Sequence, residues 1–204
     1  AGATLAASFN ASTADEVDKS LKADLVVQPA SMNGLGTRLS TEKAKEITAI
    51  DGVKETSSYT AYTDAVTKPD GSQNPMATNV VIDPATYSRA YDANVSAGTL
   101  EDLDATHVAA QKDEGLKVGD KVSFTGPNGS VEATVGALID PKGTGGNFYI
   151  APELAASVGS WSSPGNTTDP ARVLDSPLGI LLTLDEGANI DTVRHKAEDI
   201  VADT

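Results

Sequence analysis

The stretch from Gly115 to Asp140 constrains the fold most, because it carries the pattern of a β-hairpin. Apolar residues alternate with polar or small ones on both sides of a short break: Val118, Val122 and Phe124 before it, and Val131, Ala133, Val135 and Ala137 after it. Pro127-Asn128-Gly129 is predicted to reverse the chain there, since Asn and Gly tolerate positive φ. Nothing in this stretch suggests bond-making chemistry, so it is predicted to be scaffold.

The composition bounds the class of protein. A chain of 204 residues can bury a sizeable core, either as one domain with an insertion or as two small lobes. Only 4% of the residues are aromatic, so Val, Ile, Leu and Ala must build that core. The net charge of −14 argues against binding to nucleic acid or anionic lipid, because both require a basic face. The chain has no cysteine, which excludes disulfides, thiolate nucleophiles and cysteine-bound metals.

No segment approaches the ~18–20 continuous apolar residues that a membrane span requires. The start of the chain also lacks the basic, apolar and small-residue pattern of a signal peptide. Because the first residue is Ala1 rather than Met, we expect the chain to be a piece excised from a longer protein.

The first half of the chain predicts alternating helices and strands. The predicted elements are a helix over residues 4–23, a strand over 25–27, a helix from Ser40 to Gly52, and strands over 54–68 and 76–83. The first helix has a thin apolar stripe at four-residue spacing. Ser40 is a typical N-cap, and Gly52 a typical C-terminal stop. After the first helix, the predicted order is therefore β-α-β-β.

The second half is richer in short strands. The predicted elements are a short helix after Asp83-Pro84, a strand over 106–110, the hairpin, a strand over 148–150, a short helix over 152–159, a strand over 178–184 and a helix over 190–201. Residues 178–184 form a nearly continuous aliphatic run, typical of a central strand that is buried on both faces. Residues 160–177 are rich in Ser, Pro, Gly, Asn and Thr and are predicted to be flexible.

These elements predict a mixed α/β (α+β) fold with two lobes. Residues 1–23 are the N-terminal helix, and residues 24–94 with 177–204 build an α/β lobe from both ends of the chain, on the principle that connections are short. Residues 95–176 form a β-rich lobe inserted into the first.

A few residues could bind a metal or perform catalysis. Glu101, Asp102, Asp104 and His107 lie close together in the sequence, but their spacing matches no zinc signature. A solvated acidic loop is the simpler interpretation. His195 lies opposite the apolar stripe of its helix and is predicted to face solvent.

Other patterns resemble known sites only in part. The segment 159–163 has Trp161 where a G-x-S-x-G motif requires its nucleophile. The glycine-rich segment 140–147 precedes a short strand rather than a helix, so we expect a surface loop and not a phosphate site. Residues 185–191 offer oxygen ligands, although Asn189 or Asp191 is more simply a helix cap. Paired carboxylates for glycoside cleavage stay open among the 29 acidic residues, although there are few aromatic residues to stack on a sugar.

Aromatic residues could line a contact surface, because such rings are favoured at interfaces. The candidates are Tyr59, Tyr62, Tyr87, Tyr91 and Trp161. Packing at the edges of the lobes is the alternative. We predict no catalytic, cofactor-binding or metal-binding residue, and no cofactor.

The order of segments carries a resemblance to a known family. The segments are Phe9–Ser12, Lys22–Val27, Leu39–Val53, Val80–Pro84, Ala97–Leu100, Gly115–Val122 and Leu178–Ala202. In this order they resemble the extracytoplasmic domain between the first and second membrane spans of FtsX/MacB-type ABC transporter permeases. The versions in Gram-positive, actinobacterial permeases are the most similar, and Gly-Leu-Lys-Val-Gly-Asp at 115–120 is the most specific phrase.

The resemblance implies a domain without catalytic residues. Residues 1–23 would continue from a membrane span, and the lobe of residues 24–94 and 177–204 would be a porter-like lobe next to the membrane. The partners would be the membrane spans of the same permease and a cytoplasmic ABC ATPase, with room for a second permease copy and an extracellular protein or peptide. The domain would lie on the cell-surface side of the plasma membrane. It would couple ATP hydrolysis to substrate export or to control of a cell-surface partner.

Two other functions stay open. A stand-alone cell-surface binding or adhesion module would have the same fold without neighbouring membrane spans. A hydrolase hidden among the Ser, His and Asp residues would lose its activity in the variants His107→Ala or His195→Ala.

Overall fold

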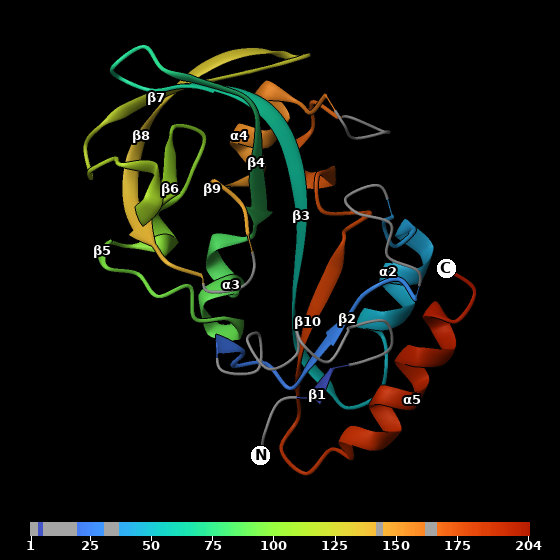
Figure 1. Cartoon of the computed structure of the whole chain (residues 1–204). Coiled ribbons are helices and arrows are strands. Elements are labelled where there is room, and N and C mark those ends of the chain that lie inside the picture. Colours follow the sequence, from blue (N-terminus) through green and yellow to red (C-terminus); the bar gives the residue numbers. More distant parts are fainter. Residues whose placement is uncertain (1–3, 6–19, 31–36, 142–144, 162–166) are drawn as a thin grey trace.

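The computed structural model describes the chain except for residues 1–3, 6–19, 31–36, 142–144 and 162–166 (Figure 1). The strands are β1 (Thr4–Leu5), β2 (Leu25–Val27), β3 (Val53–Thr67), β4 (Gln73–Ile82), β5 (Ala97–Gly98), β6 (His107–Gln111), β7 (Lys121–Gly126), β8 (Gly129–Ile139), β9 (Phe148–Ile150) and β10 (Gly179–Leu184). The helices are α2 (Thr41–Thr48), α3 (Pro84–Ala90), α4 (Pro152–Val158) and α5 (Ile190–Val201), with short 3₁₀ turns η2 (Leu100–Asp102), η3 (Lys112–Glu114) and η4 (Pro170–Arg172).

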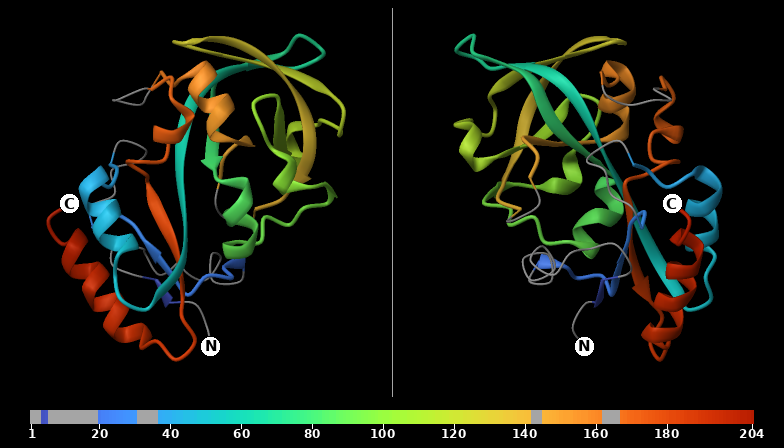
Figure 2. Two further views of the ribbon diagram at one scale, coloured as in Figure 1. Left: turned by 180° about the vertical axis from the view of Figure 1, so that it is seen from behind. Right: turned by 45° about the vertical axis from the view of Figure 1, so that its right-hand side comes forward.

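One end of the molecule is a sheet covered by two helices, which we call the first layer. Strands β1, β2, β10 and the first half of β3 lie in that order, and β10 is antiparallel to both of its neighbours. Figures 1 and 2 show α2 and α5 side by side against these strands. Their apolar faces enclose a buried cluster that includes Leu25, Val27, Leu39, Ile47, Ile180, Leu182, Val193, Ala197 and Val201.

At the other end, six strands close into a ring. The pairings run from β3 to β4, β9, β6, β8 and β7, and β7 returns to pair with β3. A second buried cluster joins this ring to α4, and Phe124 and Phe148 pack edge to face at its centre with ring centroids 5.2 Å apart. Burial of this apolar surface is the main contribution to holding the ring together.

Strand β3 belongs to both ends of the molecule. The residues from Val53 to Tyr59 pair with β10, and Ala65 to Thr67 pair along the same edge with β7. Between these pairings lie residues 60–64, which we call the waist. There the Ala61 carbonyl accepts a hydrogen bond from Arg38 Nη2 (2.9 Å), and the Thr63 carbonyl accepts one from the Trp161 amide (3.1 Å). Side chains and a loop thus take the place of a neighbouring strand at the waist.

Most of the predicted elements are present, and the predicted mixed α/β fold is confirmed. The hairpin consists of β7 and β8, which pair up to Gly126 and Gly129 around a two-residue turn. Strand β10 is buried on both faces, as its aliphatic run predicts. Ile180 belongs to the cluster under α2 and α5, and Leu181 belongs to a separate cluster on the other face of the strand. Val118 departs from the prediction. It precedes β7 and is 48% exposed, in the turn where Gly119 takes a φ of 97°.

The predicted helix over residues 4–23 falls mainly on residues 6–19, outside the described residues. The first two residues of the predicted helix, Thr4 and Leu5, form the strand β1, which runs parallel to Leu25 and Val26. The backbone groups of β2 offer hydrogen-bond partners to Thr4 and Leu5. A helix with only a thin apolar stripe would gain less stability from packing than this pairing provides. In the predicted flexible segment 160–177, residues 162–166 also lie outside the description, whereas Val173 is buried against the ring cluster.

The ring combines strands from both predicted lobes, since β3 and β4 come from residues 24–94 and β6 to β9 from residues 95–176. The lobe boundaries stay a prediction. In the parts of the chain that the structure describes, no helix is both long enough and apolar enough to cross a membrane.

Candidate functional site

The acidic segment near His107 lies at the surface. Asp104 Oδ1 is 2.8 Å from His107 Nδ1 and accepts a hydrogen bond from the Thr106 amide, so the carboxylate stabilises the turn before β6. Both side chains of the pair are about half exposed, at 55% and 45%. Glu101 and Asp102 lie in η2. Among the described residues, no group of three or more His, Asp or Glu side chains is placed to hold a metal ion.

The other candidate residues have structural roles. His195 is exposed on α5, with Nδ1 3.6 Å from Glu198. The Ser160 hydroxyl accepts a hydrogen bond from the Thr63 amide at the waist. In the glycine-rich loop, residues 142–144 lie outside the description, and the Asn147 side chain accepts from the Thr78 amide beside β9. Asn189 accepts a hydrogen bond from the Thr192 amide, as a helix cap does.

The aromatic residues divide between core and surface. Tyr87 packs against Tyr91 and Tyr149, with ring centroids 5.5 and 5.7 Å away, and Tyr62 is also buried. These tyrosines are therefore packed inside the protein and do not line a contact surface. Trp161 differs, since 59% of its surface is exposed.

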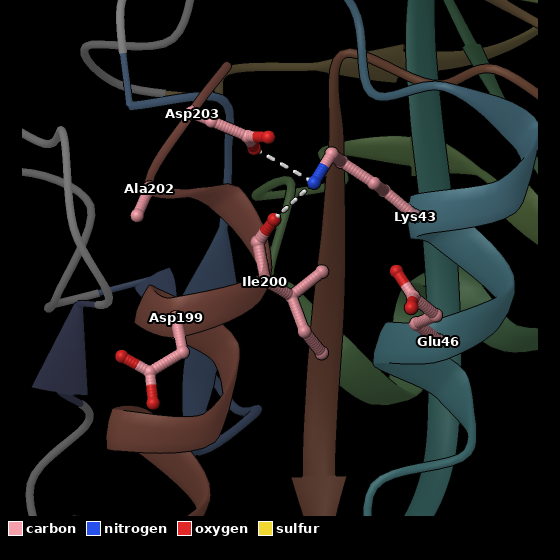
Figure 3. A pocket seen from close by; sticks show the side chains of 6 residues that line it. All are labelled: Lys43, Glu46, Asp199, Ile200, Ala202 and Asp203. Atoms are coloured by element: carbon pink, nitrogen blue, oxygen red, sulfur yellow. Dashed lines mark hydrogen bonds and ion pairs between the residues drawn. The ribbon is translucent and has the colours of Figure 1, made fainter.

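A shallow hollow of about 480 Å³ lies between α2 and α5, near the last residues of the chain (Figure 3). Its lining residues are Lys43, Glu46, Asp199, Ile200, Ala202 and Asp203. The Lys43 ammonium donates to the Ile200 carbonyl and lies 2.7 Å from Asp203 Oδ1. Lys43 therefore satisfies a carbonyl at the end of α5 that has no partner within the helix.

Charge pairing fixes this junction. The hydrogen bond to Asp203 raises the pKa of Lys43, and the same bond lowers the pKa of Asp203. The Thr204 hydroxyl donates to the Val201 carbonyl and accepts from the Ala30 amide, just after β2. The end of α5 is therefore tied to both α2 and the region after β2.

A second polar group lies inside the ring, at the waist. Asp64 and Asn79 are each 0% exposed, and Asn79 Nδ2 donates to Asp64 Oδ2 at 3.3 Å. Burial raises the pKa of Asp64 to about 7, against the opposing effect of the Asn79 hydrogen bond. No motif in the sequence marks Asp64 as a site residue. Its two-residue spacing from Tyr62 and Val66 does predict that the side chain faces the same, inward side of the strand.

The fold defines a class: a helix-covered sheet and a ring of strands that share one long strand. The sequence matches no protein-family model, and no curated protein is similar enough to count as a relative. Solved structures do match. The periplasmic region of MacB from Actinobacillus actinomycetemcomitans aligns with a TM-score of 0.55 at 10% identity, over 86% of this chain and 80% of that chain.

Two more structures are similar. The extracellular domain of the noncanonic ABC-type transporter YknZ from Gram-positive bacteria gives a TM-score of 0.54 at 14% identity, over 87% of this chain and 91% of that chain. A domain of a protein described as a permease, from Porphyromonas gingivalis, gives 0.51 at 13% identity, over 71% and 67% of the two chains. The chain has the fold of the extracytoplasmic domains of ABC transporter permeases, which confirms the predicted resemblance at the level of the fold.

Proposed function

We propose that the chain is a non-catalytic extracytoplasmic domain of an ABC transporter permease. It couples ATP hydrolysis in the cytoplasm to export of a substrate or to control of a cell-surface partner. The observation that carries this proposal is the shared fold, which extends over 86% of the chain with MacB and 87% with YknZ. The arrangement of the two histidines supports it, because each lies at the surface beside a carboxylate, His107 near Asp104 and His195 near Glu198.

The placement of β1 and α5 supports the coupling role. Both belong to the first layer, β1 through its pairing with β2 and α5 through its contacts with α2 (Figure 1). A membrane span joined to either element would pull on this layer. Strand β3 would carry the displacement into the ring, because its 15 residues run without interruption from one end to the other.

The partners follow from this role. The domain would work with the membrane spans of the same permease and with a cytoplasmic ABC ATPase. A second permease copy and an extracellular protein or peptide are further partners that the role allows. Among the described residues, the exposed Trp161 is the aromatic side chain that best fits contact with such an extracellular partner.

The first test is to translate the coding DNA on both sides of this chain. We expect a span of ~20 apolar residues leading into Ala1, and another shortly after Thr204. Two more spans further along the protein would strengthen the transporter assignment. A cleavable signal peptide before Ala1 with no span after Thr204 would contradict it and favour a stand-alone binding or adhesion module.

A second test asks on which side of the membrane the domain lies. Met76 is 69% exposed, so Met76→Cys in a cysteine-free version of the full-length protein should react with a membrane-impermeant maleimide on intact cells. Ala109 is 0% exposed, so the control variant Ala109→Cys should react only after unfolding. Reaction of Met76→Cys in broken cells alone would place the domain in the cytoplasm and contradict the proposal.

A further inference from the structure

Asp64 occupies an unusual position, at the point where the ring of strands closes. Strands β3 and β7 join through three residue pairs, Ala65–Thr125, Val66–Phe124 and Thr67–Ser123, which we call the seam. Asp64 is the next residue of β3 beyond this seam. Its side chain is fully buried, in register with Tyr62 and Val66, which both belong to the buried cluster of the ring.

Two oxygen atoms beside the seam lack a hydrogen-bond donor. Asp64 Oδ1 and Asn79 Oδ1 are both buried without a partner among the described residues, while Asn79 Nδ2 donates to Asp64 Oδ2. While the carboxyl is ionised, both oxygens are hydrogen-bond acceptors, so they cannot form a hydrogen bond with each other. A proton on Asp64 supplies a donor, because a protonated carboxyl group has one O–H and the Asn79 amide oxygen can accept it. Leaving the carboxylate charged and unpaired in this position would be far more costly.

The carboxyl group also lies close against β7, at Gly126. A Cβ atom added at Gly126 of β7 would lie 2.6 Å from Asp64 Oδ1 and 2.5 Å from the carbonyl oxygen of Val158, the last residue of α4. The absence of a side chain at Gly126 therefore makes room for the Asp64 carboxyl. Because the group is fully enclosed, hydration of an ionised Asp64 requires one of these neighbours to move.

Among the described residues, burial and the Asn79 hydrogen bond are what shift the pKa of Asp64, and no charged group stabilises the carboxylate. Asn79 on β4 and Gly126 on β7 lie against the carboxyl group, and neither is charged. On β3, Tyr62 lies two residues away with a pKa raised by burial. The Arg38 guanidinium is bonded to the Ala61 carbonyl.

We propose that Asp64 is a proton-dependent latch: protonated, it pairs with Asn79 and holds the seam between β3 and β7 closed, and ionised, it opens that seam. The direction follows from linkage. The closed seam raises the pKa of Asp64 to about 7, whereas an exposed Asp titrates near 3.8, so closing takes up a proton between these values. The fraction of open seam should rise about tenfold per pH unit from pH 5 to 7, and then level off. This inference rests on the ring itself and not on the proposed transporter role.

Hydrogen exchange of backbone amides tests the latch in the wild-type chain. After correction for the intrinsic pH dependence of exchange, protection should fall about tenfold per pH unit between pH 5 and 7 for those amides of residues 65–67 and 123–125 that point across the seam. The amides of Ile180 and Leu182, in the pairing of β10 with β2 and β3, are the internal control and should change much less. Equal changes in both sets, or no change at the seam, would overturn the proposal.

The variant Asp64→Asn keeps the shape of the side chain without the titration. We expect seam protection in this variant to be independent of pH between pH 5 and 8. The matched control Asp113→Asn removes an exposed carboxyl on η3 and should retain the wild-type pH dependence. If Asp64→Asn retains it too, Asp64 is not the latch.

A direct titration serves if Asp64→Asn does not fold. The ¹³C resonance of the Asp64 carboxyl in the wild-type chain should titrate with a midpoint near 7. A midpoint near 4, the ordinary value for Asp, would contradict the proposal.

Discussion

Single side chains define where the helices begin. Ser40 accepts a hydrogen bond from the Lys43 amide at the start of α2, Asp83 one from the Ala85 amide at α3, and Asn189 one from the Thr192 amide at α5. Each residue satisfies an amide that has no partner within its helix. These short contacts link neighbouring residues, so they work in the same way wherever the helix lies in the fold.

The N-cap of α2 provides a prediction at this scale. Ser40→Ala should lower the free energy of unfolding by about 1 kcal/mol, because the Lys43 amide loses its acceptor at 3.1 Å. Urea unfolding measures the difference. Thr41→Ala changes a neighbouring exposed hydroxyl and should have a much smaller effect; a loss as large as that of Ser40→Ala would show that the cap is not responsible.

At the scale of elements, β7 and α4 approach each other closely. Asn128, in the turn after β7, donates from its backbone amide to the Val158 carbonyl (2.9 Å) and from its side chain to the Ala156 carbonyl (3.1 Å). The hairpin is therefore fastened to the last turn of α4. After Gly159, the chain continues into Ser160 and Trp161, which bond to the waist of β3.

This close approach predicts a cost for adding one methyl group. Gly126→Ala should destabilise the protein by about 1–3 kcal/mol, because the new Cβ would lie within 2.6 Å of two oxygen atoms, one of them in the backbone. Gly136→Ala in β8 is the matched control, since its nearest neighbour would be 3.7 Å away. Similar urea midpoints for the two variants would show that β7 and α4 can separate without loss.

At the scale of the whole molecule, β3 makes the two ends one cooperative unit. The same strand pairs with β10 in the first layer and with β4 and β7 in the ring. Neither end can lose β3 without disturbing the other, so unfolding should be a single transition.

The single tryptophan of the chain allows a test of this cooperativity. Trp161 fluorescence, which reports on the waist, and far-UV circular dichroism should give the same urea midpoint. A second probe, His195→Trp in a Trp161→Phe background, reports on α5 in the first layer and should give that midpoint too. Separate midpoints for the two tryptophan probes would mean that the two ends unfold independently.

Much of the local structure could be predicted from the sequence. The hairpin of β7 and β8, the central strand β10, the amphipathic helix α5 and the cap at Ser40 all follow from patterns within about twelve residues of each other. Local propensity and periodicity suffice for such elements, because the interactions that form them are local.

The candidate sites were decided by tertiary structure. Lys43 and Ile200 are 157 residues apart, and nothing in either segment indicates that the lysine reaches the end of α5. The spacing of Asp64 from Tyr62 and Val66 indicates an inward-facing side chain, but its pairing with Asn79 depends on the register of β3 with β4.

The sequence by itself determined the hairpin of β7 and β8, the strand β10 and the helices α2 and α5, and which of their faces are apolar. It did not determine the short strand β1, which forms only because β2 lies beside it. The tertiary structure alone decided that β7 returns to β3 and closes the ring, and hence that a carboxyl group is buried beside the seam. The physical reason is the distance along the sequence over which each interaction acts. Helix caps and alternating patterns act between neighbours, whereas strand pairing and burial depend on segments that meet only when the whole chain has folded.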